Sequence, residues 1–179
     1  PTTTGNVVFT TDGTSWSSTQ KIVQGTAVAS TSGTSIAFTA LPAWVKRVTI
    51  EFQGVSTNGT SNLQVQLGTG ATPTYTTSGY LGTRIELANA AAVSGANNSS
   101  GFFLTNTFAN TFIQHGAIYL SNLTGNTWVC TAILGRSDTN NLVLNAGSIA
   151  LGAALTAVRV TTVNGTDTFD AGNINILYE

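Results

Sequence analysis

Charge is almost absent from this chain: its 179 residues include six Lys and Arg and seven Asp and Glu, so that 7% are charged. Soluble domains usually carry about 25% charged residues. Phosphate binding needs clustered Lys and Arg, and no such stripe is present, so nucleic acid is a poor candidate partner. No apolar run approaches the length of a bilayer span, and we therefore expect no insertion into a membrane.

Residues that bind metals or carry hydrolytic chemistry are equally scarce. The chain has one His and one Cys, so no His–His or Cys–Cys pair can form a metal site, and we expect neither metal nor cofactor. A Ser–His–Asp triad would need His115 as its base, and no Gly-x-Ser-x-Gly turn is present. We expect His115 to be a structural or interface histidine, on a strand face shared with Ile113, Ala117 and Tyr119. Cys130, within an apolar run, is expected to be a buried small hydrophobe.

The few carboxylates leave a glycosidase as a minor alternative, because that chemistry needs two carboxyl groups roughly 5–9.5 Å apart. We expect Glu51 and Glu86 instead to form cross-strand or same-face ion pairs with Arg47 and Arg84. Asp167 and Asp170, on either side of Phe169, are expected to bond turn backbone. The sequence thus predicts a protein without catalysis.

Thr, Ser, Asn, Gln and 19 Gly replace the missing charges, while 41% of the residues are hydrophobic. That fraction and the length predict one domain with a core, not a disordered chain. The chain lacks Met and begins at Pro1. Removal of an initiator Met before Pro would explain this, but we favour a C-terminal fragment of a longer protein.

Strand signals dominate the pattern. Val48, Ile50 and Phe52 alternate with polar residues, as in a half-buried antiparallel strand. A wide hairpin is expected to join Lys46–Phe52 to the alternating Leu63–Leu67 segment through Asn58-Gly59. Further strands are expected at Thr83–Leu87, Gly101–Leu104, Thr111–Leu120, Thr127–Leu134, Leu142–Leu144, Thr156–Val163 and Asn173–Tyr178. The spacing predicts an all-β, antiparallel β-sandwich, jelly-roll-like in type.

The strand pattern also predicts how the chain is divided into domains. Residues 1–24 are interpreted as a connecting or stalk segment with a short hairpin around Asp12-Gly13, and residues 25–179 as the sandwich. The segment Leu87–Val93 is the one place where a turn or two of helix is expected.

Binding residues are expected in the loops, because loops on a rigid scaffold carry most recognition. Aromatic faces with amides and hydroxyls suit a neutral ligand such as a glycan. The ligand-binding candidates are Tyr75, Tyr80, Asn97, Asn98, Phe108, Arg136, Asp138 and Asn140.

Three segments carry a resemblance to a known family. The runs Trp44–Asn62 and Arg159–Glu179 resemble the C-terminal regions of bacteriophage tail-fibre and tail proteins, and Lys21–Ala27 resembles the linker that precedes such tips. The terminal run is the most specific. The shared residues look like framework, and the middle of the chain, residues 68–147, has no match, so no binding or catalytic residue is carried over.

The resemblance implies a homotrimeric β-sandwich at the distal end of a virion tail fibre, outside the cell. There it would join the remainder of the fibre and bind a bacterial surface polysaccharide or outer-membrane receptor during adsorption. The two-sided apolar strand Trp128–Leu134 is our candidate for the trimer interface. Alternatives are another virion role, as a capsid decoration or fibre-anchoring domain, and, as the weakest, a polysaccharide depolymerase or glycan-binding module.

Overall fold

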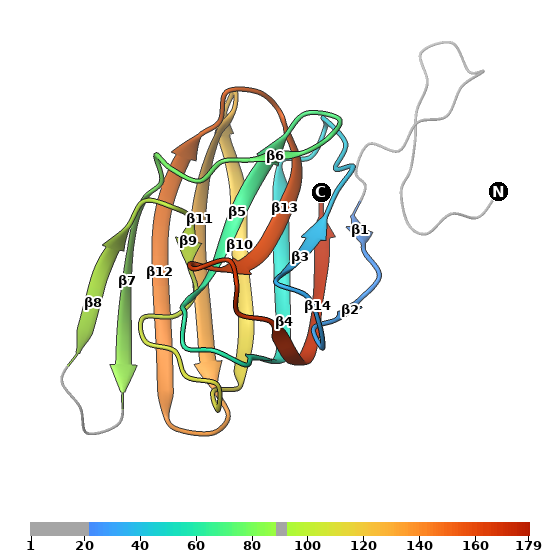
Figure 1. Ribbon diagram of the computed structural model, residues 1–179. Helices are drawn as coiled ribbons and strands as arrows, with labels where there is room; N and C mark the ends of the chain where they lie inside the picture. Colours follow the sequence, from blue (N-terminus) through green and yellow to red (C-terminus); the bar gives the residue numbers. More distant parts are fainter. Residues whose placement is uncertain (1–21, 89–92) are drawn as a thin grey trace, which may run out of the picture.

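The computed structural model describes residues 22–88 and 93–179, which form two stacked antiparallel sheets without a helix in those ranges (Figure 1). The large sheet contains the strands β1 (Val23–Gln24), β2 (Val28–Ala29), β4 (Arg47–Thr57), β7 (Leu81–Ala88), β8 (Ser94–Asn98), β10 (Gln114–Thr124), β11 (Thr127–Arg136), β12 (Asn141–Ala150) and β14 (Phe169–Tyr178). The small sheet contains β3 (Ser35–Phe38), β5 (Leu63–Thr69), β6 (Thr74–Tyr75), β9 (Phe102–Phe103) and β13 (Leu155–Thr162). The all-β antiparallel sandwich expected from the sequence is confirmed.

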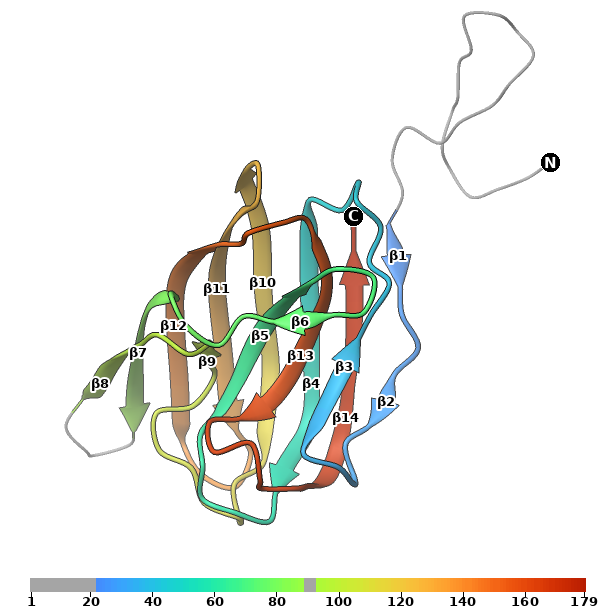
Figure 2. The ribbon, with the colours of Figure 1, turned by 45° about the horizontal axis from the view of Figure 1, so that its top comes forward.

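The strand order shows how the chain moves between the layers. The large sheet runs β1-β14-β4-β10-β11-β12-β7-β8, with β2 also on β14, and the small sheet runs β3-β13-β5-β6, with β9 also on β5. Figure 2 shows β3, β5 and β13 stacked against the large sheet. Within residues 22–88 and 93–179, every strand expected from the sequence overlaps an observed one. The expected hairpin between Lys46–Phe52 and Leu63–Leu67 is wrong, because β4 and β5 belong to different sheets and the Asn58–Asn62 loop crosses between them.

The core lies between the sheets and follows the alternation of the sequence. Val48, Ile50 and Phe52 of β4 are buried, while Arg47 and Glu51 on the opposite face are exposed. Val65 and Leu67 of β5, with Val158 and Val160 of β13, close the core from the small sheet. Burial of these side chains is the main stabilising contribution, at about 1.5–3 kcal/mol for each large aliphatic one.

A bulge couples β4 to β14 at two glycines. Gly54 has φ +67° and Gly172 has φ +93°, backbone conformations that residues with a Cβ rarely adopt. A Cβ on Gly172 would also overlap the carbonyl of Gly54. The bulge places the Gly54 N–H against the His115 ring, 3.2 Å from Nδ1.

The two ends of the sandwich differ. Val23 pairs with Tyr178, so the first described strand and the C-terminus lie side by side at the end that carries the label C in Figure 1. The loops after β4, β11 and β13 lie at the other end. Asparagines gather in the loops of that second end, namely Asn58, Asn62, Asn106, Asn110, Asn140 and Asn164.

Two local expectations fall partly outside the described residues. The hairpin around Asp12-Gly13 lies outside them, whereas Val23–Gln24, the end of the expected connecting segment, form β1 of the large sheet. The expected helical turn at Leu87–Val93 begins instead with the last two residues of β7, and residues 89–92 lie outside the described ranges.

Polar contacts correct the expected ion pairs. Arg47 pairs with Glu179 at 2.6 Å, not with Glu51. Arg84 donates from Nε to Asn106, and Glu86 accepts from Thr107 and Asn141, so neither charge pairs with the other. Asp167 does bond turn backbone, accepting from the Ser61 N–H at 2.9 Å, whereas Asp170 lies within β14 and not in a turn. These charges serve the framework, as expected, but through other partners.

Candidate functional site

The residues predicted to bind a ligand do not converge. Tyr75 lies on β6, an edge strand of the small sheet. Tyr80, Asn97 and Asn98 lie where β7 meets β8, and the remaining four lie at the Asn-rich loop end. Those four are Phe108, Arg136, Asp138 and Asn140. The structure thus separates them into three places.

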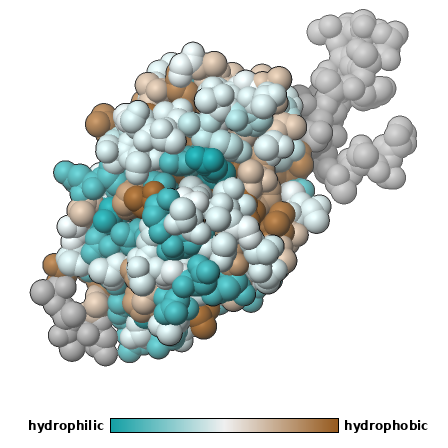
Figure 3. Space-filling model, viewed as in Figure 1, coloured by the Kyte–Doolittle hydropathy of each residue, from teal (hydrophilic) through white to brown (hydrophobic). Residues whose placement is uncertain are grey.

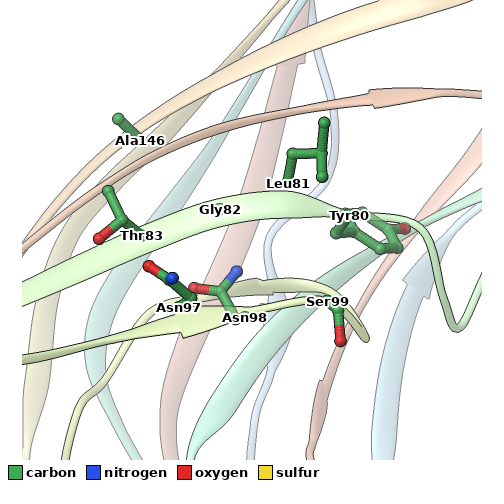
Figure 4. A pocket seen from close by; sticks show the side chains of 8 residues that line it. All are labelled: Tyr80, Leu81, Gly82, Thr83, Asn97, Asn98, Ser99 and Ala146. Atoms are coloured by element: carbon green, nitrogen blue, oxygen red, sulfur yellow. The ribbon is translucent and has the colours of Figure 1, made fainter.

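The first place is a shallow hollow of about 540 Å³ between β7 and β8. Figure 4 shows Leu81 and Thr83 along β7 and the neighbouring Asn97 and Asn98 along β8. Leu81 is 74% exposed, and Asn97 is exposed as well. Asn98 is buried and donates to the Gly101 carbonyl at 2.7 Å, so it holds the turn after β8.

Two of the predicted aromatic residues belong to the core. The Tyr80 ring is 1% exposed and stacks edge-on against Phe102 at 4.9 Å. Phe108 is 7% exposed and contacts Phe112. Neither ring offers a face to a ligand, which leaves the half-buried Tyr75 as the accessible aromatic candidate.

At the loop end, the opposite charges of Arg136 and Asp138 are paired with each other. They form a salt bridge, the guanidinium lies over the Phe112 ring, and Asp138 also accepts from the Ile113 N–H at 3.1 Å. The hydrogen bond from Arg136 lowers the pKa of Asp138. Arg136 and the exposed Asn140 line a hollow of about 440 Å³. Because the two charges are already paired, their main role is structural: Asp138 connects the β11–β12 loop to the backbone of Ile113. We call this pair the Arg136–Asp138 clasp.

A better-built site lies on the outer face of the small sheet. The register places Ser35, Thr161 and Gln64 in one row across β3, β13 and β5, and Ala37, Arg159 and Gln66 in the next. A hollow of about 420 Å³ opens over these rows, which we call the polar groove. Its lining residues are Thr34, Ser35, Gln64, Gln66, Thr77, Ser100, Arg159, Thr161, Thr162, Val163 and Gly165.

Hydrogen bonds fix the floor of the polar groove. Gln66 donates to the Ser100 carbonyl at 2.7 Å, and its Oε1 accepts from Nε and Nη2 of Arg159 at 2.8 and 2.6 Å. Gln64 accepts from the Ser100 hydroxyl at 3.0 Å and donates to the Thr162 carbonyl. Both glutamines are nearly fully buried at 2% and 3% exposure. The donors and acceptors of the floor are therefore held before a ligand arrives, which lowers the ordering cost of binding.

Tyr75 forms part of the same arrangement. The Arg159 guanidinium lies 4.3 Å from the centre of the Tyr75 ring, within the range of a cation–π contact. Gly68 makes room for this ring, because a Cβ there would lie 3.0 Å from two of its carbon atoms. Burial raises the pKa of the Tyr75 hydroxyl, so it stays neutral at physiological pH beside the positive guanidinium.

Sequence reasoning missed the groove because its residues lie on strands. The alternation of Gln64 and Gln66 with apolar residues indicates only an outward face, and it cannot show that the segment around Ser100 folds over that face. The two glutamines on either side of Val65, on a face without a charged residue of the same strand, were the available signal in the sequence.

His115 sits in an arrangement that does not match a nucleophilic serine. Its Nε2 lies 3.1 Å from Ser137 Oγ, while Nδ1 accepts from the Gly54 backbone N–H. A ring nitrogen that accepts carries no proton, so in the neutral ring Nε2 is the N–H that points at the serine. A catalytic base needs the reverse tautomer. His115 shares its strand face with Ala117 and Tyr119, and it ties β10 to the β4 bulge, as a structural histidine.

The remaining reactive groups are dispersed. Cys130 is buried as expected, and burial raises its pKa far above the usual range. Within residues 22–88 and 93–179, no three His, Cys, Asp or Glu side chains gather in a way that could hold a metal ion. The same ranges contain no helix able to span a membrane.

The outer face of the large sheet is apolar where β7, β12, β11 and β10 lie side by side. The register aligns Ile85, Leu144, Ile133 and Ala117 in one row. Six side chains on this side of the sheet are between 37% and 47% exposed, and together we call them the apolar face. They are Ile85, Leu87, Tyr119, Ile133, Leu142 and Leu144. A hollow of about 320 Å³ opens between Ile85, Ile133 and Leu144. Figure 3 shows the surface in the view of Figure 1, where hydrophilic (teal) and intermediate (white) residues predominate and hydrophobic (brown) residues are scattered.

Comparison with known proteins adds no relative: no protein-family model matches the chain, and no curated protein matches it significantly.

Proposed function

We propose that this domain is a non-catalytic attachment domain at the distal end of a virion tail fibre, which binds a bacterial surface glycan during adsorption. The observation that carries the proposal is the polar groove. Its floor offers fixed amides, hydroxyls and one guanidinium, and it is flanked by Tyr75. Sugars present alternating donors and acceptors, and such groups orient a ligand without a strong field.

The scarcity of charge supports a glycan over other partners. With 7% charged residues, the chain has little means of steering an ionic macromolecule over a distance. A glycan needs no such steering, because many copies on a cell surface meet a binding protein at high local concentration. Weak contacts of this kind gain strength when several sites act together.

The apolar face supports assembly into a homotrimer. Side chains from four adjacent strands form one patch, and each of its members is at least 37% exposed in the single chain. Patches of this kind on soluble proteins mark interaction sites. A second and third copy of this chain would cover the patch and multiply the polar groove. Ile133 comes from the Trp128–Leu134 strand that the sequence suggested for this role.

The placement of the chain ends is compatible with a fibre tip. The described N-terminal strand β1 and the C-terminus lie together at one end of the sandwich. A fibre joined there would leave the Asn-rich loop end pointing away from the virion. The Arg136–Asp138 clasp and Asn140 remain secondary binding candidates at that outer end.

The test is binding of the purified chain to immobilised lipopolysaccharide O-chains and capsular polysaccharides from a panel of bacteria. We expect retention on at least one polysaccharide. Ser35→Trp, which fills the polar groove from the exposed edge of β3, should weaken that binding at least tenfold, whereas Ala29→Trp on exposed β2 should not. Retention on no polysaccharide, or equal binding by the Ser35→Trp variant with its fold intact, would refute the proposal.

A further inference from the structure

The guanidinium of Arg159 has an unused edge. Arginine carries five N–H donors in a planar fork. Nε and one N–H of Nη2 are taken by Gln66 Oε1, so the two N–H groups of Nη1 and one of Nη2 have no partner among the described residues. The edge formed by Nη1 and Nη2 can bind a carboxylate with two parallel hydrogen bonds, and here it is the edge that Gln66 leaves open.

The charge of Arg159 is also uncompensated. In the part of the chain that the structure describes, Arg47 and Arg136 form salt bridges and Arg159 forms none. The lining of the polar groove contains no carboxylate, and the neighbouring Tyr75 hydroxyl is neutral. A half-buried cation with neutral neighbours attracts a negative group strongly, because the surroundings screen it less than water does.

From this edge and this charge, we propose that the polar groove binds a sugar residue that bears a carboxylate, of the uronic-acid type. The inference rests on the proposed function and narrows its ligand from glycans in general to acidic ones. The carboxylate lies against Nη1 and Nη2 of Arg159, while the sugar hydroxyls face Thr34, Ser35 and Thr77.

Two features favour a carboxylate over a neutral sugar or a doubly charged phosphate. A carboxylate is planar and matches the planar guanidinium edge, so it gains two aligned bonds. It carries one negative charge, and the groove lining supplies one cation. Gln66 and Tyr75 act as positioning residues for Arg159. Gln66 accepts hydrogen bonds from the Nε edge of the guanidinium, and the Tyr75 ring packs against its face.

The experiment measures binding of the purified chain to oligogalacturonate and to the same oligosaccharide with its carboxyl groups reduced to alcohols. Charge-assisted bonds of this type predict about ten- to hundredfold tighter binding of the acidic form. Arg159→Gln should abolish the preference. Arg159→Lys, which keeps the charge but lacks the fork, should recover only part of it. The matched control is Arg47→Gln, which removes one positive charge outside the groove and should leave the preference intact.

The outcomes separate this inference from the proposed function. Equal binding of the acidic and reduced oligosaccharides, or stronger binding of a phosphorylated counterpart, overturns the carboxylate assignment while glycan binding stands. A preference lost equally in Arg47→Gln and Arg159→Gln also overturns it. Retention of neither oligosaccharide and of no member of the polysaccharide panel overturns both.

Discussion

At the scale of single residues, buried polar side chains organise this sandwich. With so few charges, the chain uses amides and phenols to satisfy backbone groups in its interior. Tyr80 is the clearest case, because its hydroxyl accepts from the Leu67 N–H at 2.8 Å and donates to the Thr76 carbonyl at 3.2 Å. The residue therefore links β5 to the segment that follows β6.

Tyr80→Phe tests this role. The change leaves the buried Leu67 N–H without a partner, and we expect a loss of about 1–3 kcal/mol in the free energy of unfolding at pH 7. Tyr178→Phe, at a half-buried position whose hydroxyl has no hydrogen-bond partner among the described residues, should cost less than about 0.5 kcal/mol. Urea unfolding followed by tryptophan fluorescence measures both. A Tyr80→Phe variant as stable as the native chain would contradict the role.

The same residue predicts a pH dependence. Burial raises the pKa of Tyr80 from 10.0 to about 12, so the folded state favours the neutral phenol. The stabilisation is fully present below pH 10 and is lost as the pH rises through 12, with about 1.4 kcal/mol gone by pH 11. Tyr80→Phe lacks this dependence, and the stability advantage of the native chain should shrink between pH 9 and pH 11. A constant difference would contradict the assignment.

At the scale of elements, β11 serves two surfaces at once. Trp128, Cys130 and Leu134 point into the core, while Ile133 contributes to the apolar face. A strand with apolar residues on both faces needs cover on both. The small sheet covers one side, and we attribute the cover of the other to further copies of this chain.

Ile133→Lys tests that assignment. A charge in the middle of the apolar face would remain unpaired when the face is buried, so we expect the assembly to dissociate into folded monomers. Leu123→Lys, near the end of β10 and 67% exposed, introduces the same charge outside the face and should leave the assembly intact. Sedimentation velocity gives the masses. A monomeric native chain, or dissociation by both variants, would contradict the trimer.

The sequence predicts these elements well where one face is buried and poorly where pairing is between distant segments. The alternation in Val48–Phe52 and Leu63–Leu67 locates β4 and β5 correctly. It does not show that the strands belong to different sheets, because alternation carries no information about partners. The short strands β6 and β8 show little alternation of apolar and polar residues in the sequence. They form because β5 and β7 have free edges with which they can pair. The sequence predicts a loop at Tyr75, which the structure places on β6, and it indicates a framework role for Arg159 and singles out neither Gln64 nor Gln66.

At the scale of the whole molecule, three surfaces have three characters. The apolar face is uncharged and suits assembly, the polar groove is ordered and suits recognition, and the Asn-rich end lies away from the described chain ends. Two asparagines of that end accept hydrogen bonds from loop backbone: Asn58 from the Thr168 N–H at 2.9 Å, and Asn164 from the Thr166 N–H at 3.0 Å. Together these surfaces fit the glycan-attachment domain that we propose.

The most direct test is the fate of a surface polysaccharide that the chain binds, followed by size-exclusion chromatography with light scattering after prolonged incubation. An attachment domain without catalysis predicts that protein and polysaccharide elute together and that the mass of the polysaccharide does not change. A fall in that mass with new reducing ends, or separate elution of the protein from every polysaccharide in the panel, would contradict the account.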